Sequence, residues 1–262
     1  DGVRRAVRRR VADGADVIKF YADYRRKVMR IPPTRDSILF PPMDRNPAAV
    51  MFTQEEMNAI VDEARAANLP VAAHAGTARG ATMAAKAGVT TVEHVNEGDA
   101  EAFRAIRDNG CIFVPTIAVI DAVSKSDVPA MKAKVKEAYK MGVRFAAGGD
   151  TGAFSHGDGV KEMELMMDAG IPVNEVLEAC MIGGWESCGK EASGYKFGWL
   201  EQGTRADIIA LDADPREDKT ALRKVSFVMK DGKVWKHNGV PVGFIDALME
   251  DAGHSEPSWQ LV

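Results

Sequence analysis

LPVAAH at residues 69–74 and TTVEH at residues 90–94 are short apolar runs that each end in a histidine. ADVIKF at residues 15–20 and VRFAAGGD at residues 143–150 are two further runs of this kind, and both carry a polar side chain at or near their ends. Segments with helical patterning separate the four runs, and strands that alternate with helices are typical of a parallel sheet or barrel. Because the C-terminal ends of such strands carry the chemistry of these folds, the sequence predicts a functional site at one end of an α/β structure.

The same alternation continues to residue 183 and gives five units of a strand followed by a helix. We expect strands at 15–21, 70–74, 90–95, 111–115 and 143–148, and helices at 3–13, 53–68, 79–87, 98–108, 128–141, 160–169 and 173–183. Thr53 and Glu56 have the spacing of a capping box, which supports a helix start at this point. Residues 22–52 contain five prolines, and we expect a long loop there.

The sequence changes in character after about residue 192. GWLEQGTRADIIALDADP at residues 198–215 and VSFVMKDGKVWKHNG at residues 225–239 are rich in turn residues and alternating apolar residues. Asp231 and Gly232 stand between two alternating stretches, a pattern that predicts a tight β-hairpin. We therefore expect three parts: an α/β domain at residues 1–192, a small β-rich part at residues 193–243 and a C-terminal tail at residues 244–262.

Composition and charge argue against several classes of protein. The 262 residues can bury the core of one large domain or two modest ones. The net charge of -4 gives no reason to expect a nucleic-acid partner, and we expect the five arginines among the first ten residues to form a solvated helix face. No apolar stretch approaches the roughly 20 residues that span a bilayer, so we expect no membrane partner.

The cysteines and the N-terminal residues bear on the compartment. Cys111, Cys180 and Cys188 lack CxxC spacing, which fits a reducing environment. The first residues are polar and lack the apolar core of a secretory signal. We expect a cytoplasmic protein, and secretion stays open in case further residues precede this sequence.

Lys19 lies in the first predicted strand, where alternate residues share a face. Val17, Lys19 and Tyr21 would point one way, into the lumen of a barrel, while Ile18 and Phe20 point the other way. An unpaired lysine in such a place loses solvation energy or shifts its pKa, so it needs a specific partner. Two explanations stay open: an ion pair at the strand end, and a carbamate formed with carbon dioxide that can bridge two divalent metal ions.

His74 and His94 end consecutive strands, so their side chains would stand side by side at one rim of the sheet. Imidazole is a common ligand of zinc, and we expect these histidines to bind a metal, although a lone histidine is more often a core or loop residue. Asp150 follows the last strand, where a carboxylate can bind metal and accept a proton from water that the metal acidifies. Its alternative role is the N-cap of a following helix.

Two further residues are candidates for contact with a substrate. Tyr21 shares the predicted lumen face with Lys19, and its phenol could donate a hydrogen bond to a developing oxyanion. His156 lies six residues past Asp150 in AFSHGDG and could contact the substrate. The alternatives are packing at the rim for Tyr21 and an ordinary surface position for His156.

Five motifs occur along the chain in a fixed order: VIKFY at 17–21, AHAGT at 73–77, VEHVN at 92–96, GGDTG at 148–152 and GxLExGxxADIIxLD at 198–212. Together they resemble the amidohydrolase superfamily, and within it the imidazolonepropionase-like group that includes Xaa-Pro dipeptidases and ochratoxinase-like enzymes. The resemblance implies an α/β fold, a (β/α)8 TIM barrel flanked by a small β-sandwich. Residues 1–192 would then hold barrel strands four to eight, and residues 193–243 would form part of the sandwich.

The resemblance also implies roles for the site residues. Lys19 would be carboxylated by carbon dioxide and would bridge two divalent metal ions, with zinc as the expected metal. His74 and His94 would hold one of these ions. Asp150 would ligate the other and would carry protons.

One feature departs from this family, because the HxH pair of its first strand is absent. The other histidines are His156, His237 and His254. An open sheet of five strands would also leave two unpaired edges. We therefore expect an N-terminal segment or a separate chain to supply strands one to three, HxH and the rest of the sandwich, with a degenerate half-barrel as the alternative. We further expect a homo-oligomer.

The function that the resemblance implies is that of a metal-dependent amidohydrolase. A metal-activated hydroxide would cleave an amide or peptide bond, and Asp150 would carry the proton to the leaving nitrogen. The expected substrate is a small molecule, either a dipeptide with C-terminal proline or an N-acyl amino acid. Two alternatives stay open: a hydrolase of cyclic amides of the imidazolone type, and a non-catalytic scaffold, which the absence of HxH would favour.

Overall fold

The structure is a computed structural model that describes residues 1–25 and 48–242. The chain divides into two compact units, Asp1–Tyr195 and Lys196–Val262. The tail expected at 244–262 lies outside the described residues, and so does the middle of the loop expected at 22–52.

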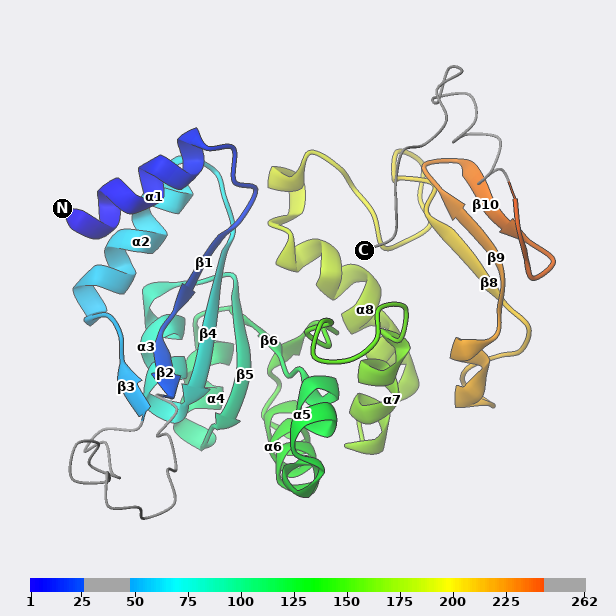
Figure 1. Cartoon of the computed structure of the whole chain (residues 1–262), viewed down its shortest axis with the longest axis horizontal. Coiled ribbons are helices and arrows are strands. Elements are labelled where there is room, and N and C mark those ends of the chain that lie inside the picture. Colours follow the sequence, from blue (N-terminus) through cyan, green and yellow to red (C-terminus); the bar gives the residue numbers. More distant parts are fainter. Residues whose placement is uncertain (26–47, 243–262) are drawn as a thin grey trace, which may run out of the picture. The chain divides into compact units, whose positions relative to one another are not determined.

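The first unit is built on a sheet of five parallel strands (Figure 1). In sheet order the strands are β1 (Ile18–Tyr21), β4 (Val71–Thr77), β5 (Thr91–Glu97), β6 (Ile112–Val114) and β7 (Arg144–Phe145). Helices follow each strand along the chain, so the α/β prediction is confirmed. β1 and β7 each pair with a single neighbour within the described residues, and these therefore form an open sheet rather than a closed barrel.

Helices and short 3-10 turns connect the strands. In chain order they are α1 (Gly2–Ala12), α2 (Gln54–Ala66), α3 (Ala78–Ala87), α4 (Ala100–Asp108), α5 (Ile117–Val123), η2 (Lys125–Asp127), α6 (Val128–Lys140), α7 (Val160–Asp168), α8 (Val173–Ser187) and η3 (Lys190–Ser193). The capping box at the start of α2 is present, with Thr53 and Glu56 each bonded to the backbone of the other. Among the described helices, none has the length and apolar character needed to cross a membrane.

One face of β1 is packed and the other is exposed in this chain. Ile18 and Phe20 are 5% and 6% exposed, while Lys19 and Tyr21, which alternate with them, are exposed. Phe20 packs edge to face on Phe52, with ring centroids 5.8 Å apart. The period of two expected for the first strand is therefore confirmed, and Lys19 and Tyr21 share the exposed face.

The structure corrects three expectations about elements. The segment expected as a loop at 22–52 carries a short strand at each end, and β2 (Asp23–Arg25) pairs antiparallel with β3 (Ala48–Val50). The strand expected at 143–148 is a strand only over β7, because the N–H of Ala147 donates to the carbonyl of Ala179 on α8 and not to the neighbouring strand. The helix α5 was not expected, because its seven residues are too few to display a helical period.

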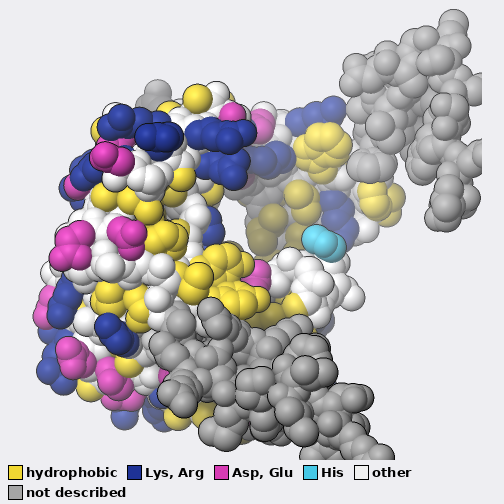
Figure 2. Space-filling view, turned by 60° about the vertical axis from the view of Figure 1, so that its left-hand side comes forward, with side chains coloured by type: hydrophobic (Ala, Val, Ile, Leu, Met, Phe, Trp, Pro, Cys, Tyr) yellow, Lys and Arg dark blue, Asp and Glu magenta, His cyan; other side chains and the backbone are white. Residues whose placement is uncertain are grey.

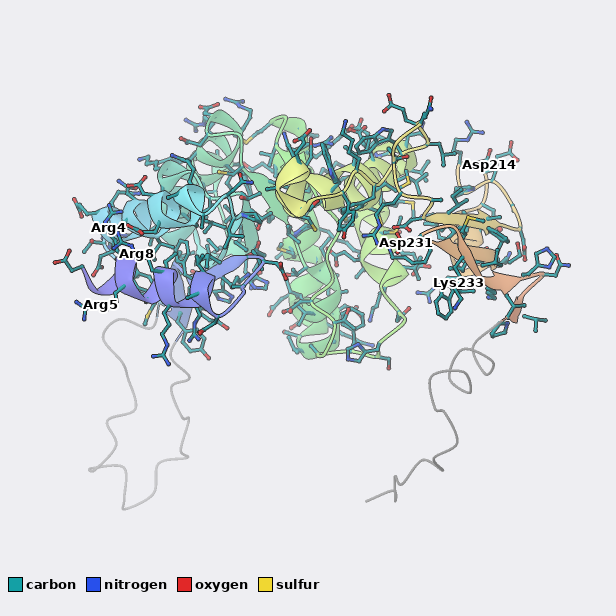
Figure 3. All side chains as sticks on the ribbon, turned by 90° about the horizontal axis from the view of Figure 1, so that it is seen from above. Arg4, Arg5, Arg8, Asp214, Asp231 and Lys233 are labelled. Carbon is teal, nitrogen blue, oxygen red and sulfur yellow. The ribbon has the colours of Figure 1, made fainter. Side chains whose placement is uncertain are left out.

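The N-terminal arginines fasten α1 to the rest of the unit. Arg4 and Arg8 both bind the carboxylate of Glu63 on α2, with nitrogen to oxygen distances of 3.0 Å and 2.5 Å. These bonds lower the pKa of Glu63 to about 2. Figure 3 labels Arg4, Arg5 and Arg8 along α1, and in Figure 2 dark blue side chains gather over this helix, above exposed hydrophobic side chains.

The second unit contains a four-stranded antiparallel sheet in the order β11-β10-β9-β8. Its elements are β8 (Ile208–Leu211), the 3-10 turn η4 (Lys219–Arg223), β9 (Val225–Lys230), β10 (Lys233–His237) and β11 (Val240–Pro241). Asp231 and Gly232 join β9 to β10 with φ of 52° and 76°, so the predicted hairpin is confirmed. Arg205 also binds the Asp231 carboxylate, which Figure 3 labels next to Lys233.

Candidate metal centre

The predicted site residues lie at the C-terminal ends of the parallel strands. Pairing of β1 with β4 sets Tyr21 opposite His74, and pairing of β4 with β5 sets His74 opposite Glu93. Lys19 lies one alternation before Tyr21 and shares its face. The register therefore gathers Lys19, His74 and Glu93 on one face of three neighbouring strands.

His94 joins this group through an irregular backbone. Strict alternation from Glu93 would send His94 to the opposite face of β5. Its φ of 75°, and the φ of 49° at Val95, lie in the left-handed region, and the register of β4 with β5 shifts just after His94, so the strict alternation of side chains is broken there. As a result the imidazoles of His74 and His94 meet, with ring centroids 4.4 Å apart.

Both histidines are held as neutral imidazoles. Burial is the main cause that lowers the pKa of His94 to about 3, and the neighbouring His74 and Lys19 act in the same direction. Burial also lowers the pKa of His74, where Lys19 acts in the same direction and the carboxylates of Asp23 and Asp150 oppose it. A neutral imidazole has a lone pair available for a metal, so both rings are in the protonation state that metal binding requires.

Lys19 forms an ion pair at the strand end. Its Nζ donates to Oε2 of Glu93, and the other oxygen of Glu93 accepts from the hydroxyl of Thr91. The Glu93 carboxylate is largely buried and lies between the two donors. The contact with Glu93 is an ion pair of the kind that the first explanation for Lys19 describes.

Asp23 was not predicted as part of the site. It is 2% exposed, and its carboxylate accepts from the backbone N–H of Gly76 at 2.7 Å and of Thr77 at 3.1 Å. The Thr77 hydroxyl donates to it as well, at 2.7 Å. Asp23 thus fixes the end of β4 just beyond His74. Asp23 lies two residues past Tyr21, so the alternation of residues 19, 21 and 23 could have indicated that it belongs to the site.

The remaining predicted residues lie at different distances from this group. Asp150 is exposed, adopts a φ of 57°, and acts on His74 through its charge. It does not cap a helix, because α7 begins ten residues later with Gly159 as its N-cap. Tyr21 contacts the His74 ring, with centroids 4.7 Å apart. His156 is exposed in the following segment, and the structure does not bring it to the imidazoles.

The residues present fit part of a metal centre. His74 and His94 offer two adjacent neutral donors, and Lys19 lies near both, since its charge lowers the pKa of each. In the part of the chain that the structure describes, no group of three or more His, Cys, Asp or Glu side chains is placed to hold a metal ion. His74 and His94 are therefore the two metal-binding side chains that the described residues bring into contact.

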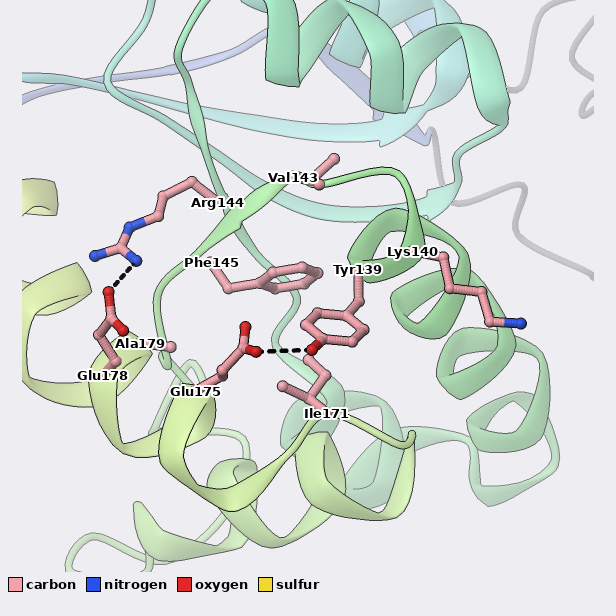
Figure 4. Close-up of a pocket in the computed structure, with 10 residues that line it drawn as sticks. Tyr139, Lys140, Val143, Arg144, Phe145, Ile171, Glu175, Glu178 and Ala179 are labelled. Atoms are coloured by element: carbon pink, nitrogen blue, oxygen red, sulfur yellow. Dashed lines mark hydrogen bonds and ion pairs between the residues drawn. The ribbon is translucent and has the colours of Figure 1, made fainter.

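A cavity of about 540 Å³ lies elsewhere on the sheet (Figure 4). It is lined by Tyr139 and Lys140 of α6, by Arg144 and its neighbours at the start of β7, and by α8. Tyr139 donates to Glu175 at 2.8 Å, and Arg144 pairs with Glu178 at 2.5 Å. Because it adjoins the N-terminal end of an edge strand, this cavity lies apart from the candidate site.

Comparison with known proteins identifies similar sequences. The model of the amidohydrolase family matches residues 2–235. An ochratoxinase from Aspergillus niger is 32% identical over 257 residues, which cover 91% of this chain and 50% of that protein. The chain thus spans about half the length of the curated relatives it matches.

The chain is also similar to solved structures. A Xaa-Pro dipeptidase with methionine bound in the active site superposes with a TM-score of 0.75 at 32% identity, over 89% of this chain and 58% of that chain. The ochratoxinase of Aspergillus niger superposes with a TM-score of 0.73 at 30% identity, over 91% of this chain and 55% of that chain.

Proposed function

This chain belongs to the amidohydrolase family, and from that premise we propose that it forms the metal-binding half of a hydrolase that cleaves an amide or peptide bond. The proposed substrates are dipeptides with C-terminal proline and N-acyl amino acids, because similar proteins include a Xaa-Pro dipeptidase and an ochratoxinase. The observation that carries the proposal is the contact between the His74 and His94 rings, both kept neutral by burial.

The chain's own side chains suit the separate tasks of the reaction. His74 and His94 would hold a divalent metal, with zinc as the expected ion, and a carbamate on Lys19 would join them. When bound, such ions polarise a carbonyl and acidify water. Asp150, at the open end of the sheet, would take a proton and pass it to the leaving nitrogen. Tyr21, beside His74, would donate to the developing oxyanion.

A carbamate on Lys19 would require a change in its present pairing. Lys19 now donates to Glu93, and a carbamate would place a negative charge near that carboxylate. Two divalent cations nearby would offset the repulsion. We therefore propose that carboxylation of Lys19 and metal binding occur together.

The whole site would need partners for the open edges of the sheet. A second cavity, of about 190 Å³, lies between α1 and β1 and is lined by apolar residues that include Val7, Ile18 and Phe20. Unpaired strand edges and apolar linings favour addition of further strands. We propose that a segment or chain outside these residues supplies strands one to three of a (β/α)8 barrel, the HxH ligands and the rest of a β-sandwich, and that the whole is a homo-oligomer.

Metal analysis tests the proposal most directly. We expect the isolated protein to carry about two divalent ions per assembled site, measured by plasma mass spectrometry. His74→Asn and His94→Asn should each lower the metal content, whereas His237→Asn, a control in the second unit, should not. A protein without divalent metal in all preparations would favour the non-catalytic scaffold.

Hydrolysis assays test the substrate class. Release of proline from Xaa-Pro dipeptides, or of the amino acid from N-acyl amino acids, should depend on the metal and should fall by at least about 100-fold in Asp150→Asn. Preferential turnover of cyclic amides would instead support the imidazolone type of reaction. Light scattering tests the assembly, because a stable monomer of this chain alone would contradict the need for added strands.

A further inference from the structure

Three residues at the ends of successive strands adopt left-handed backbone conformations. His94 in β5, Thr116 after β6 and Asp150 after β7 have φ of 75°, 52° and 57°. Histidine and aspartate occur in this region more often than other non-glycine residues, but for a β-branched threonine it is an outlier. Such a conformation is strained and persists only where the surrounding contacts hold it. The contacts of Thr116 are therefore informative.

Glu162 on α7 supplies the contacts that hold the segment after Thr116. The residue is 1% exposed, and its two carboxylate oxygens accept from the backbone N–H of Ile117 at 3.0 Å and of Ala118 at 2.7 Å. Ile117 and Ala118 are the first residues of α5 and directly follow Thr116. A buried carboxylate with two backbone donors fixes this turn more firmly than a solvent-exposed cap would.

Thr116 in turn contacts a candidate metal ligand. Its side chain is buried, and its Oγ1 lies 2.7 Å from Nδ1 of His94. With Nδ1 engaged by a hydroxyl, Nε2 is the ring nitrogen left for a metal. The hydrogen bond also fixes the rotation of the imidazole about its bond to the backbone, so that the ring stays next to His74.

Glu162 also supports the backbone beside Asp150. A Cβ placed on Gly149 would lie 3.3 Å from Cβ of Ala118 and 3.5 Å from Cβ of Glu162. Gly149 is therefore packed against the same buried group that holds the start of α5. Glu162 thus lies behind the segments that follow β6 and β7, the first of which carries Thr116 and the second Asp150.

We propose that Glu162 and Thr116 are positioning residues of the metal centre: Glu162 holds the start of α5, α5 holds Thr116 in its left-handed conformation, and Thr116 presents Nε2 of His94 to the metal. This inference rests on the proposed function, because it assigns the two residues a role towards a metal that His94 would bind. Neither residue would touch the substrate.

The test compares metal binding by the isolated wild-type protein with metal binding by variants of Thr116 and Glu162. Thr116→Val removes the hydroxyl at nearly constant volume, Thr116→Ser keeps it, and Glu162→Gln replaces one of the two acceptor oxygens with an amide nitrogen. Glu137→Gln is a matched control on the exposed side of α6. We expect the affinity for Zn²⁺, measured by competition with a chromophoric chelator, to fall by about 10- to 100-fold in Thr116→Val and Glu162→Gln. Thr116→Ser and Glu137→Gln should retain the wild-type affinity.

A second readout separates positioning from stability. The visible absorption spectrum of the Co²⁺-loaded protein reports ligand geometry, and we expect it to change in Thr116→Val and to be restored in Thr116→Ser. If Glu162→Gln does not fold, the two Thr116 variants decide the matter. Equal Zn²⁺ affinities and Co²⁺ spectra in wild type and Thr116→Val would overturn this inference alone. A wild-type protein that binds no Zn²⁺ would overturn the proposed function and this inference with it.

Discussion

Removal of the Asp23 carboxylate should destabilise the first unit by several kcal/mol. Its oxygens accept two backbone N–H groups and one hydroxyl at the end of β4, and the residue is 2% exposed. A hydrogen bond to a charged acceptor contributes about 1.5–3 kcal/mol, so two backbone bonds give about 3–6 kcal/mol. Water can enter the space left by Asp23→Ala and recover part of this loss. We therefore expect the free energy of unfolding to fall by about 2–4 kcal/mol.

Urea unfolding followed by tryptophan fluorescence and circular dichroism measures the effect. The midpoint should fall at an unchanged slope, which separates lost stability from a change in the unfolded state. Asp13→Ala is the matched control, because Asp13 is exposed at the end of α1, and its midpoint should stay near the wild-type value. A loss below about 1 kcal/mol in Asp23→Ala would refute the view that this carboxylate holds the end of β4.

Gly80 gives an independent check of the same contact. A Cβ on Gly80 would lie 1.9 Å from Oδ2 of Asp23, so Gly80→Ala should displace the carboxylate and destabilise by about 1–3 kcal/mol. In the Asp23→Ala background that collision is gone, and alanine in a helix should then stabilise by up to about 1 kcal/mol. Additive effects in the double-mutant cycle would contradict this account.

Three further predictions concern pH, the core and the metal. Burial lowers the pKa of His94 from 6.5 to about 3, so unfolding takes up a proton at His94 between these pH values and the stability falls on acidification. Burial raises the pKa of Glu162 from 4.5 to about 7, so unfolding releases a proton at Glu162 between these pH values and the stability falls as the pH rises. The two effects oppose each other between pH 4.5 and 6.5, so the Glu162→Gln variant should lose stability more steeply than wild type on acidification. Urea unfolding at a series of pH values measures this, and the same dependence of the unfolding free energy on pH in both proteins would count against these assignments. Phe113 is fully buried against Phe103 and Phe145, and Phe113→Ala should lower the free energy of unfolding by about 3–5 kcal/mol. A much smaller loss would indicate that the surrounding core closes the cavity left by the ring. Removal of metal with a chelator should lower the thermal midpoint of wild type, since a ligand that binds only the folded state stabilises it, whereas His74→Asn should show little response.

Local pattern predicted the elements of the first unit well. The alternation of Ile18 and Phe20 with Lys19 and Tyr21 is a property of neighbouring residues, and the structure keeps it. The hairpin at Asp231 and Gly232 was likewise predictable, because a two-residue turn with positive φ has few compatible sequences. Short elements such as α5, whose 7 residues make only about two helical turns, could not be found in this way.

The candidate site was predicted only in part. The sequence placed His74 and His94 at the ends of adjacent strands, but simple alternation would have turned the two rings to opposite faces. Their contact depends on the left-handed backbone at His94, and the residue types at and around this position do not predict that conformation. The sequence also gave no sign that Glu93 would pair with Lys19.

The amino-acid sequence alone determined the order of the elements, the face of β1 that carries Lys19 and the strand ends at which polar side chains gather, because these depend on residues only a few positions apart. Only the tertiary structure decided the partners of those side chains. Glu93 lies 74 residues from Lys19, Asp23 lies 53 from Gly76, and Glu162 lies 45 from Ile117. Contacts at such separations form when the strands and helices pack, so the burial and charge that set the state of each imidazole follow from the fold and not from local pattern.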